Sequence, residues 1–254
     1  MFRMMTLDAA QAVSFLENSG DLTALHDQSA IDLVCCQSLA YNRDGRVPVT
    51  DLLAGRLGLT CSCFAAVRHH AEEGSAARGL ALLTASGIWV LNSGSFTIGA
   101  HDHEATVQFA LIRKRSASVL VLNLHLATVA RIRKMQLASL FTHSLLREPY
   151  GAVALCADRA AALYAKEWQA LSNPSCYSPC HVQEDAGGGL LCLLKARLAP
   201  MATVSVTGIC SSDLPGPTLE FVVERISPEK INRPTFPLSF REQWLGYREH
   251  RAFA

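Results

Sequence analysis

The sequence has little net charge and no long apolar run. Over 254 residues the formal net charge is +1, so the chain as a whole has no field that would attract a polyanion, and nucleic-acid binding would need a local basic patch. No apolar run approaches the roughly 18 residues that a membrane-spanning helix needs. The first residues also lack the charged-then-apolar layout of a signal peptide. These absences predict a cytoplasmic protein without a transmembrane segment.

Internal repeats and low-complexity linkers are also missing from the sequence. The length fits one large α/β domain, residues 1–254, with a sizeable core. Half of the residues are hydrophobic and 18% are charged, which is an ordinary globular composition. Nine cysteines are present, and four of them lie in apolar runs: Cys35, Cys36, Cys156 and Cys192. Such cysteines are expected to be buried free thiols in a reducing compartment.

The most informative stretch is strand-like at both ends. It begins with the apolar run 119–126, in which Asn123 and His125 are the polar residues. Alternate residues of a strand face the same side, so these two side chains should point together. A helical stretch follows, and a second apolar run, 152–157, stops at Asp158. An imidazole and a carboxylate near the ends of successive strands indicate a site at the edge of an α/β sheet.

These motifs also resemble a known family. Asn-x-His-Leu at 123–126, then Arg-x-x-Gln-Leu at 133–137, then an apolar strand that ends in Asp158, is similar to the central signature of the endonuclease/exonuclease/phosphatase, or DNase I-like, superfamily. The resemblance implies a two-sheet α/β sandwich flanked by helices, in four layers. It also implies hydrolysis of a phosphate ester with Mg²⁺ or Mn²⁺.

Four further segments resemble motifs of this family in the same order. Residues 31–38 are similar to Asp-Val-Val-x-x-Gln-Glu, residues 78–84 to Gly-x-Ala-Ile-Leu-Ser, residues 218–223 to Ile-Asp-Tyr-Ile-Phe, and residues 249–254 to Ser-Asp-His-x-Pro-Val. A first strand over 2–7, ending at Asp8, stands where the family has a strand that ends in Asn. The resemblance therefore covers almost the whole chain.

The resemblance assigns a role to each matching position. It implies that His125 contacts the phosphate or protonates the leaving group, that Asp158 activates the attacking water, and that His250 is the second histidine. The residues it implies around the metal are acids: Asp8, Glu220 and Glu249. The residues it implies for substrate binding are Asn123 and Arg78.

Two positions depart from the family pattern. Ser38 stands where the family has its main metal-binding Glu, and a neutral hydroxyl cannot supply the charge that holds a hard divalent cation. Ala160 stands where the family has an Asn. Two hypotheses follow: a divergent metal-dependent phosphoesterase, or a catalytically impaired pseudoenzyme that serves as a binding or regulatory module. The expected partner is a phosphate ester, with nucleic acids and phospholipid headgroups among the classes that the resemblance allows; the substrate itself and the oligomeric state are not indicated.

Other polar clusters are predicted to be structural or solvated. The loop 101–104 (His-Asp-His-Glu) is more typical of a solvated loop than of a metal site. Cys176, Cys180 and His181 are expected to be metal-free because a fourth ligand is missing. The basic clusters 113–115 and 131–134 could contact phosphates, but a solvated surface is favoured.

The remaining expectations concern the elements between these motifs. Helices are predicted over 9–18, 51–57 and 160–171, strands over 61–67, 88–91, 107–112, 190–198 and 203–206, and a loop over 173–189.

Overall fold

The structure is a computed structural model, and it describes twelve parts of the chain. They are residues 2–8, 31–40, 48–67, 78–99, 103–115, 117–147, 150, 152–157, 177–184, 190–196, 202–209 and 218–225. The predicted helices at 9–18 and 160–171 and the closing segment 249–254 lie outside them.

One sheet, sheet A, contains six strands. They are β1 (Phe2–Asp8), β2 (Leu33–Ala40), β3 (Thr60–Val67), β4 (Arg78–Thr84), β11 (Ala202–Ile209) and β12 (Thr218–Arg225). Their order across the sheet is β11-β12-β1-β2-β4-β3. β1 and β2 are parallel, and the other neighbours are antiparallel.

A second sheet, sheet B, also contains six strands. They are β5 (Trp89–Ile98), β6 (Ala105–Lys114), β7 (Ala117–Leu124), β8 (Ala152–Ala157), β9 (Tyr177–Glu184) and β10 (Leu190–Ala196). Their order is β5-β6-β7-β8-β10-β9. β7 and β8 form the parallel pair, with Leu124 opposite Ala157. His125 and Asp158 therefore follow directly from neighbouring strand ends.

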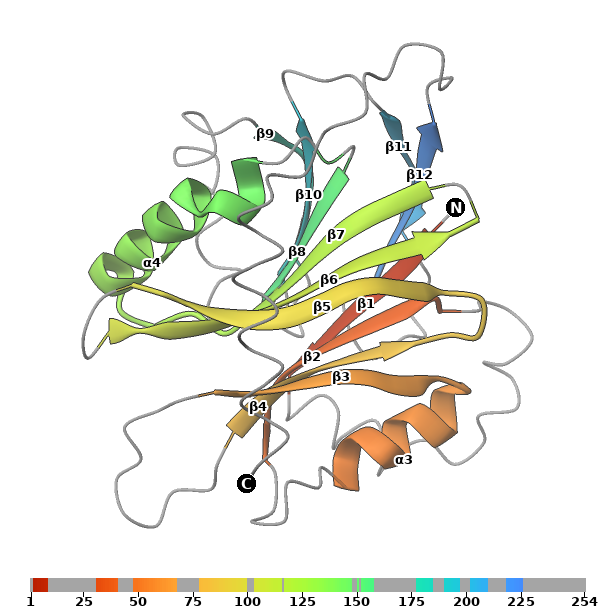
Figure 1. The fold of residues 1–254 in the computed structure, drawn as a ribbon, viewed down its shortest axis with the longest axis horizontal. Helices are drawn as coiled ribbons and strands as arrows, with labels where there is room; N and C mark the ends of the chain where they lie inside the picture. The colour runs from red at the N-terminus through yellow and green to blue at the C-terminus, as the bar shows by residue number, and fades with distance from the viewer. Residues whose placement is uncertain are drawn as a thin grey trace.

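The two sheets face each other and are covered by helices on their outer faces (Figure 1). Between the sheets lies an apolar layer to which β1, β2 and β4 contribute from one side and β6, β7 and β8 from the other. The helix α3 (Pro48–Leu57) covers the outer face of sheet A with Leu53 and Ala54. Strands such as β7 and β8 are buried on both faces, which is why their sequences are continuous apolar runs rather than alternating ones.

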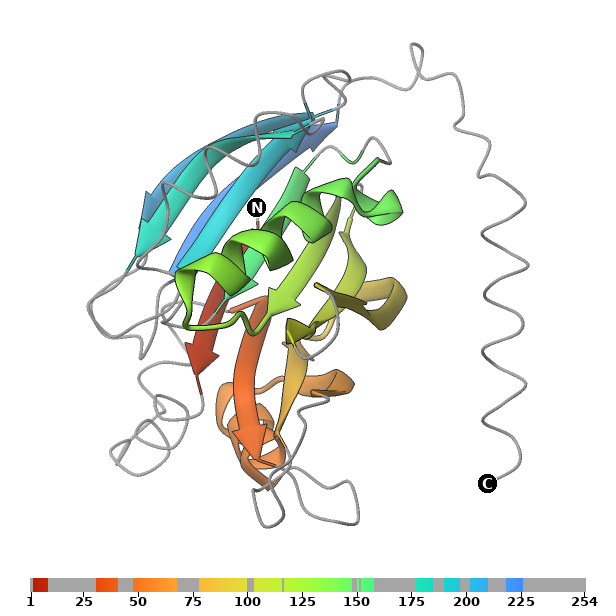
Figure 2. The same cartoon turned by 90° about the vertical axis from the view of Figure 1, so that its left-hand side faces the viewer.

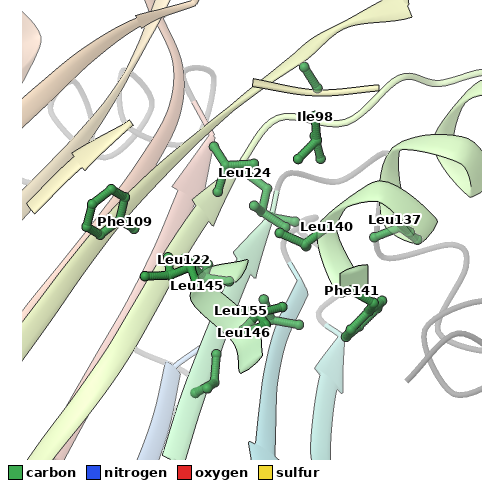
Figure 3. Packing of buried hydrophobic residues seen from close by; sticks show 14 of the residues in the cluster. Ile98, Phe109, Leu122, Leu124, Leu137, Leu140, Phe141, Leu145, Leu146 and Leu155 are labelled. Carbon is green, nitrogen blue, oxygen red and sulfur yellow. The ribbon is translucent and has the colours of Figure 1, made fainter. Parts of the chain in front are cut away.

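The outer face of sheet B is covered by α4 (Ala130–Thr142) and the short 3-10 helix η2 (Ser144–Arg147). Figure 2 shows α4 in front of the strands of sheet B. Leu137, Leu140 and Phe141 of α4, with Leu145 and Leu146 of η2, pack on the strands beneath them (Figure 3). The molecule thus has the expected four layers, and the predicted two-sheet α/β sandwich is confirmed.

An ion pair joins the sheets at the end where β2 begins. The Lys114 ammonium lies 2.7 Å from both carboxylate oxygens of Asp32, whose side chain is 8% exposed. The same carboxylate accepts a hydrogen bond from the backbone N–H of Arg3. In the basic cluster 113–115, Lys114 is therefore held in an ion pair although its side chain is 31% exposed, whereas Arg113 and Arg115 are exposed.

Most predicted strands are present with small shifts at their ends, but one loop prediction is wrong. Residues 173–189 were expected to be a loop, and β9 lies within them, paired to β10 at the edge of sheet B. The strand contains Pro179 and a register shift, and both features hide it from sequence patterns. β5 is also longer than the predicted strand 88–91.

Three cysteines confirm the expectation of buried free thiols. Cys35, Cys36 and Cys156 are buried and free. Burial, and next the neighbouring Cys156, raise the pKa of the Cys35 thiol well above its ordinary value. The Cys35 thiol therefore stays protonated and behaves as a small apolar group. In the described part of the chain, no helix has the length and apolar character needed to cross a membrane.

Candidate functional site

The candidate site begins with an irregularity near the end of β2. Cys36 is paired with Ala81 of β4, and Leu39 is paired with Gly79. Two residues of β2, Gln37 and Ser38, therefore stand opposite one residue of β4, which is the definition of a β-bulge. The extra residue changes the alternation of side chains along the strand.

The bulge directs two successive side chains toward sheet B. Cys36 and Leu39 both pack in the core on the outer face of sheet A, although they are three residues apart. Between them, Gln37 bonds to Asn123 of β7, and Ser38 bonds to His125, the residue that follows β7. Ser38 takes up the extra residue with φ of 57°, a left-handed conformation that few non-glycine residues adopt.

Gln37 bonds to Asn123 across the interior of the sandwich. The Gln37 Nε2 group donates to Oδ1 of Asn123 at 2.7 Å, and the Asn123 amide donates to Oε1 of Gln108 at 3.0 Å. Asn123 also donates to the backbone carbonyls of Cys36 and Ala81, at 3.0 and 3.1 Å. Each of the three side chains is buried. Buried amides are costly unless they are paired, so this network specifies how the two sheets fit together.

Ser38 and His125 meet next to this network. The Ser38 Oγ atom lies 2.9 Å from Nδ1 of His125, and both side chains are partly buried. The contact joins the ends of β2 and β7, which belong to different sheets. It therefore brings the predicted phosphate-contacting imidazole to the position where the family has its metal-binding carboxylate.

The segment after His125 is held by two side chains of α4. Arg133 is buried, and its Nη1 group donates to the carbonyls of Ala127 and Thr128, each at 2.9 Å. Gln136 accepts from the backbone N–H of Ala127 and donates to the carbonyl of His103. Arg133 is thus an internal anchor and not part of a solvated basic face, which corrects that prediction; Arg131 and Lys134 are exposed, as predicted.

Arg78 lies at the same end of sheet A as Ser38. It begins β4 opposite Ala40, two residues beyond Ser38, and its side chain is exposed. Alternation along β4 places it on the face of Leu82, which packs in the layer between the sheets. The two residues predicted to bind substrate, Arg78 and Asn123, thus differ in their exposure to solvent. Arg78 is at the surface, whereas Asn123 is fully buried beneath the site and its binding of substrate stays a prediction.

Two of the acidic residues predicted to bind the metal lie at different register positions along sheet A. Asp8 is paired with Gln37 and so ends β1 beside the site. Glu220 is paired with Arg3, five residues back along β1, or roughly 16 Å at the rise of a strand. The structure gives the backbone of these two residues, and their roles at a metal stay predictions.

Several predicted site residues lie outside the described parts of the chain. They are Asp158, Ala160, Glu249 and His250, and their roles stay predictions. Cys176 is also outside, and of Cys180 and His181 the structure gives the backbone in β9. His103 and Glu104 of the loop 101–104 are exposed, which agrees with the predicted solvated loop.

The described donors do not form a site for Mg²⁺ or Mn²⁺. At the position of the family's carboxylate, the structure has the neutral hydroxyl of Ser38, which bonds to an imidazole. Among the residues that the structure describes, no three His, Cys, Asp or Glu side chains lie together as a metal site would need. Hard cations are bound through carboxylates, so the described hydroxyl of Ser38 does not supply the charge that this cofactor needs at that position.

Sequence reasoning missed the residues that support the site. Gln37, Gln108 and Gln136 were given no role, and Arg133 was assigned to a surface. The signal that could have found Gln37 and Gln108 is a long polar side chain within an apolar strand, because such a residue needs a buried partner. No sequence pattern indicates the bulge itself.

Solved structures with the same arrangement show the fold to be that of the endonuclease/exonuclease/phosphatase, or DNase I-like, proteins. The chain is similar to the human Nocturnin catalytic domain with a bound sulfate anion, with a TM-score of 0.58 and 17% identity over 87% of this chain and 93% of that one. A mannosyl-6-phosphatase from Bacteroides thetaiotaomicron gives 0.54 and 9% identity, over 87% and 100%. An endonuclease/exonuclease/phosphatase from Bacteroides vulgatus gives 0.54 and 10%, over 89% and 99%. No protein-family model and no curated protein matches the sequence.

The buried network predicts that Asn123→Ala destabilises the protein strongly. The change removes one of the partners of Gln37, which also bonds to Thr6 and to the carbonyl of Cys35. It also removes the donor to Oε1 of Gln108 and to two backbone carbonyls, and a buried group that loses its partner costs about 1–3 kcal/mol. We expect the free energy of unfolding to fall by about 2 kcal/mol or more, measured by urea denaturation. Asn92→Ala, at a half-exposed position of β5, is the matched control and should change it by less than about 0.5 kcal/mol. Equal effects of the two changes would contradict the network's role.

Proposed function

We propose that this chain hydrolyses phosphate esters at the edge where β2 and β7 end. The observation that carries the proposal is the 2.9 Å contact between Ser38 and His125. It lies beyond the carboxyl ends of the parallel pairs β1–β2 and β7–β8, the place where α/β sheets bind their ligands. An imidazole there can hold the charge of a phosphate or protonate a leaving oxygen.

Among the residues that the structure describes, the charges around the site fit a ligand with a single phosphoryl group. Arg78 supplies one exposed cation at this end of sheet A. Lys114 and Arg133, from the two basic clusters, are engaged within the protein. A polyanion needs several basic side chains along its path, whereas one guanidinium suffices for a single phosphoryl group. The sulfate bound to the Nocturnin domain and the phosphatase activity in the name of the Bacteroides protein agree with this class of ligand.

The other residues take the roles that the resemblance implies. Asp158 activates water and His250 supplies the second imidazole. Asp8 ends β1 opposite Gln37, the residue before Ser38, and would take the place beside the metal. Dependence on Mg²⁺ or Mn²⁺ stays a prediction.

The second candidate is a binding or regulatory module without turnover. One observation favours it: the carboxylate position holds a hydroxyl that bonds to His125. Such a protein would still bind a phosphoryl group through the imidazole and Arg78. Binding and turnover therefore have to be measured separately.

The proposed activity predicts turnover that depends on His125. Wild-type protein should release p-nitrophenolate from p-nitrophenyl phosphate or from the bis ester, assayed with Mg²⁺, with Mn²⁺ and with a chelator. His125→Gln should lower kcat about 10²- to 10⁴-fold, the usual contribution of one acid–base group. His103→Gln is the matched control, because His103 is exposed, and it should leave the rate unchanged.

Two outcomes would contradict the hydrolase. Equal rates for His125→Gln and wild type would place any chemistry elsewhere. No turnover under any condition, together with binding of inorganic phosphate that Arg78→Ala weakens, would favour the binding module.

A carboxylate at position 38 predicts a gain of metal binding. Ser38→Glu would place an acid beside the end of β1, where Asp8 lies, and a divalent cation relieves the repulsion between them. We expect calorimetry to show a higher Mg²⁺ affinity for this variant than for wild type. Without metal the variant should be less stable by about 1 kcal/mol, and Mg²⁺ should restore the loss by mass action. Ser38→Gln, equal in size and neutral, is the control; Mg²⁺ binding that is the same in both variants would contradict this assignment of position 38.

A further inference from the structure

We propose that Ser38 is a nucleophile activated by His125, and that it forms a covalent phosphoseryl intermediate. The inference rests on the proposed function for its substrate class, but not for the reactivity of Ser38. It assigns a purpose to the residue that replaces the family's carboxylate.

The first support is the geometry of the pair. A nucleophilic hydroxyl and its general base lie about 2.6–3.2 Å apart, and the Ser38 Oγ to His125 Nδ1 distance is 2.9 Å. A neutral imidazole with its proton on Nε2 accepts the hydroxyl proton at Nδ1. Both side chains are only partly buried.

The second support is the strained backbone of Ser38. A left-handed φ of 57° at a non-glycine residue costs free energy, and such residues cluster at active sites. The strain has a specific consequence here, because the bulge turns Ser38 toward sheet B. In a regular strand its side chain would lie on the outer face of sheet A, with Cys36. The left-handed residue is thus what delivers the hydroxyl to His125.

The third support is that neighbouring residues fix both partners. Gln37 precedes Ser38 and is held by Asn123, while Leu39 follows it and is 1% exposed. His125 lies between Asn123, which is buried, and Ala127, whose backbone is held by Gln136. A hydroxyl and an imidazole held from both sides lose little freedom when substrate binds, which is the main requirement for a positioned nucleophile.

The fourth support is electrostatic. A phosphate ester approaches as an anion, and a carboxylate at position 38 would repel it unless a cation intervened. The hydroxyl of Ser38 is neutral, and Arg78 lies at the same end of the sheet on the inner face. The site is therefore suited to direct attack on phosphorus.

The proposed reaction consumes only the phosphate ester and one water molecule. The Ser38 oxygen forms a bond to phosphorus, the bond from phosphorus to the leaving oxygen breaks, and the Ser38 proton passes to His125. The imidazolium then gives that proton to the leaving oxygen. Water then attacks the phosphorus of the phosphoserine and gives a proton to His125. The bond from phosphorus to the Ser38 oxygen breaks, and His125 returns the proton to that oxygen as phosphate departs.

An alkyl fluorophosphonate tests the nucleophile on the full chain. Attack by Ser38 forms an oxygen–phosphorus bond and expels fluoride, which leaves an adduct that intact-protein mass spectrometry detects and peptide mapping locates. We expect one adduct per chain, on Ser38. Ser38→Gly should give none, and glycine accepts a φ of 57° without strain, so this variant should fold.

Two variants separate reactivity from exposure. His125→Gln keeps a polar side chain but removes the base, and it should slow labelling about 10²- to 10⁴-fold. Ser95→Ala removes an exposed serine of β5 and should leave labelling unchanged. Absence of an adduct, an adduct that persists in Ser38→Gly, or equal rates for His125→Gln and wild type would each overturn the inference.

The same samples distinguish this inference from the proposed function. Labelling of Ser38 without turnover of any phosphate ester would leave the nucleophile standing and remove the hydrolase. Turnover that continues in Ser38→Gly would keep the hydrolase and overturn the covalent intermediate.

Discussion

The structure depends on one buried hydrogen bond between the sheets, from the Gln37 amide to Asn123. At 2.7 Å it joins β2 to β7, and the Asp32–Lys114 ion pair joins the sheets at the opposite ends of those regions. Apolar contacts between sheets are tolerant of sliding, whereas paired buried amides are not, because a displaced amide loses its partner in a medium that offers no water. The bond therefore fixes which residue of sheet A faces which residue of sheet B.

The site is a consequence of that fixed register. Once Gln37 is opposite Asn123, the next residue of β2 and the first residue after β7 come together, provided that the chain can place two successive side chains on one face. The bulge at Ser38 supplies this. α4 then holds the segment after His125 through Arg133 and Gln136. Ser38, which stands where the resemblance places a carboxylate, thus has a bonding partner of its own in His125.

The sequence predicts the layers better than it predicts the site. β7 and β8 could be located from their sequences because strands that are buried on both faces are continuous apolar runs, which a loop is not. β9 was missed because a proline and polar residues in an edge strand look like a loop. His125 and Ser38 were recognised as site positions through their motifs, but their contact was not predicted, since it depends on a bulge that leaves no pattern in the sequence. Arg133 was misplaced for a related reason: a charged side chain on a helix is normally solvated, and its binding to two carbonyls depends on the loop that it faces.

The central claim is tested most directly by a double-mutant cycle between Gln37→Met and Asn123→Leu, with the free energy of unfolding measured for each variant. If the two amides depend on each other, removing the second costs less than removing the first, because its partner is already gone. We expect the double variant to be more stable than the sum of the single changes predicts, by about 0.5–3 kcal/mol, the range found for residues in contact. Single-variant effects that add to within about 0.5 kcal/mol would show that the amides act independently and would contradict the account.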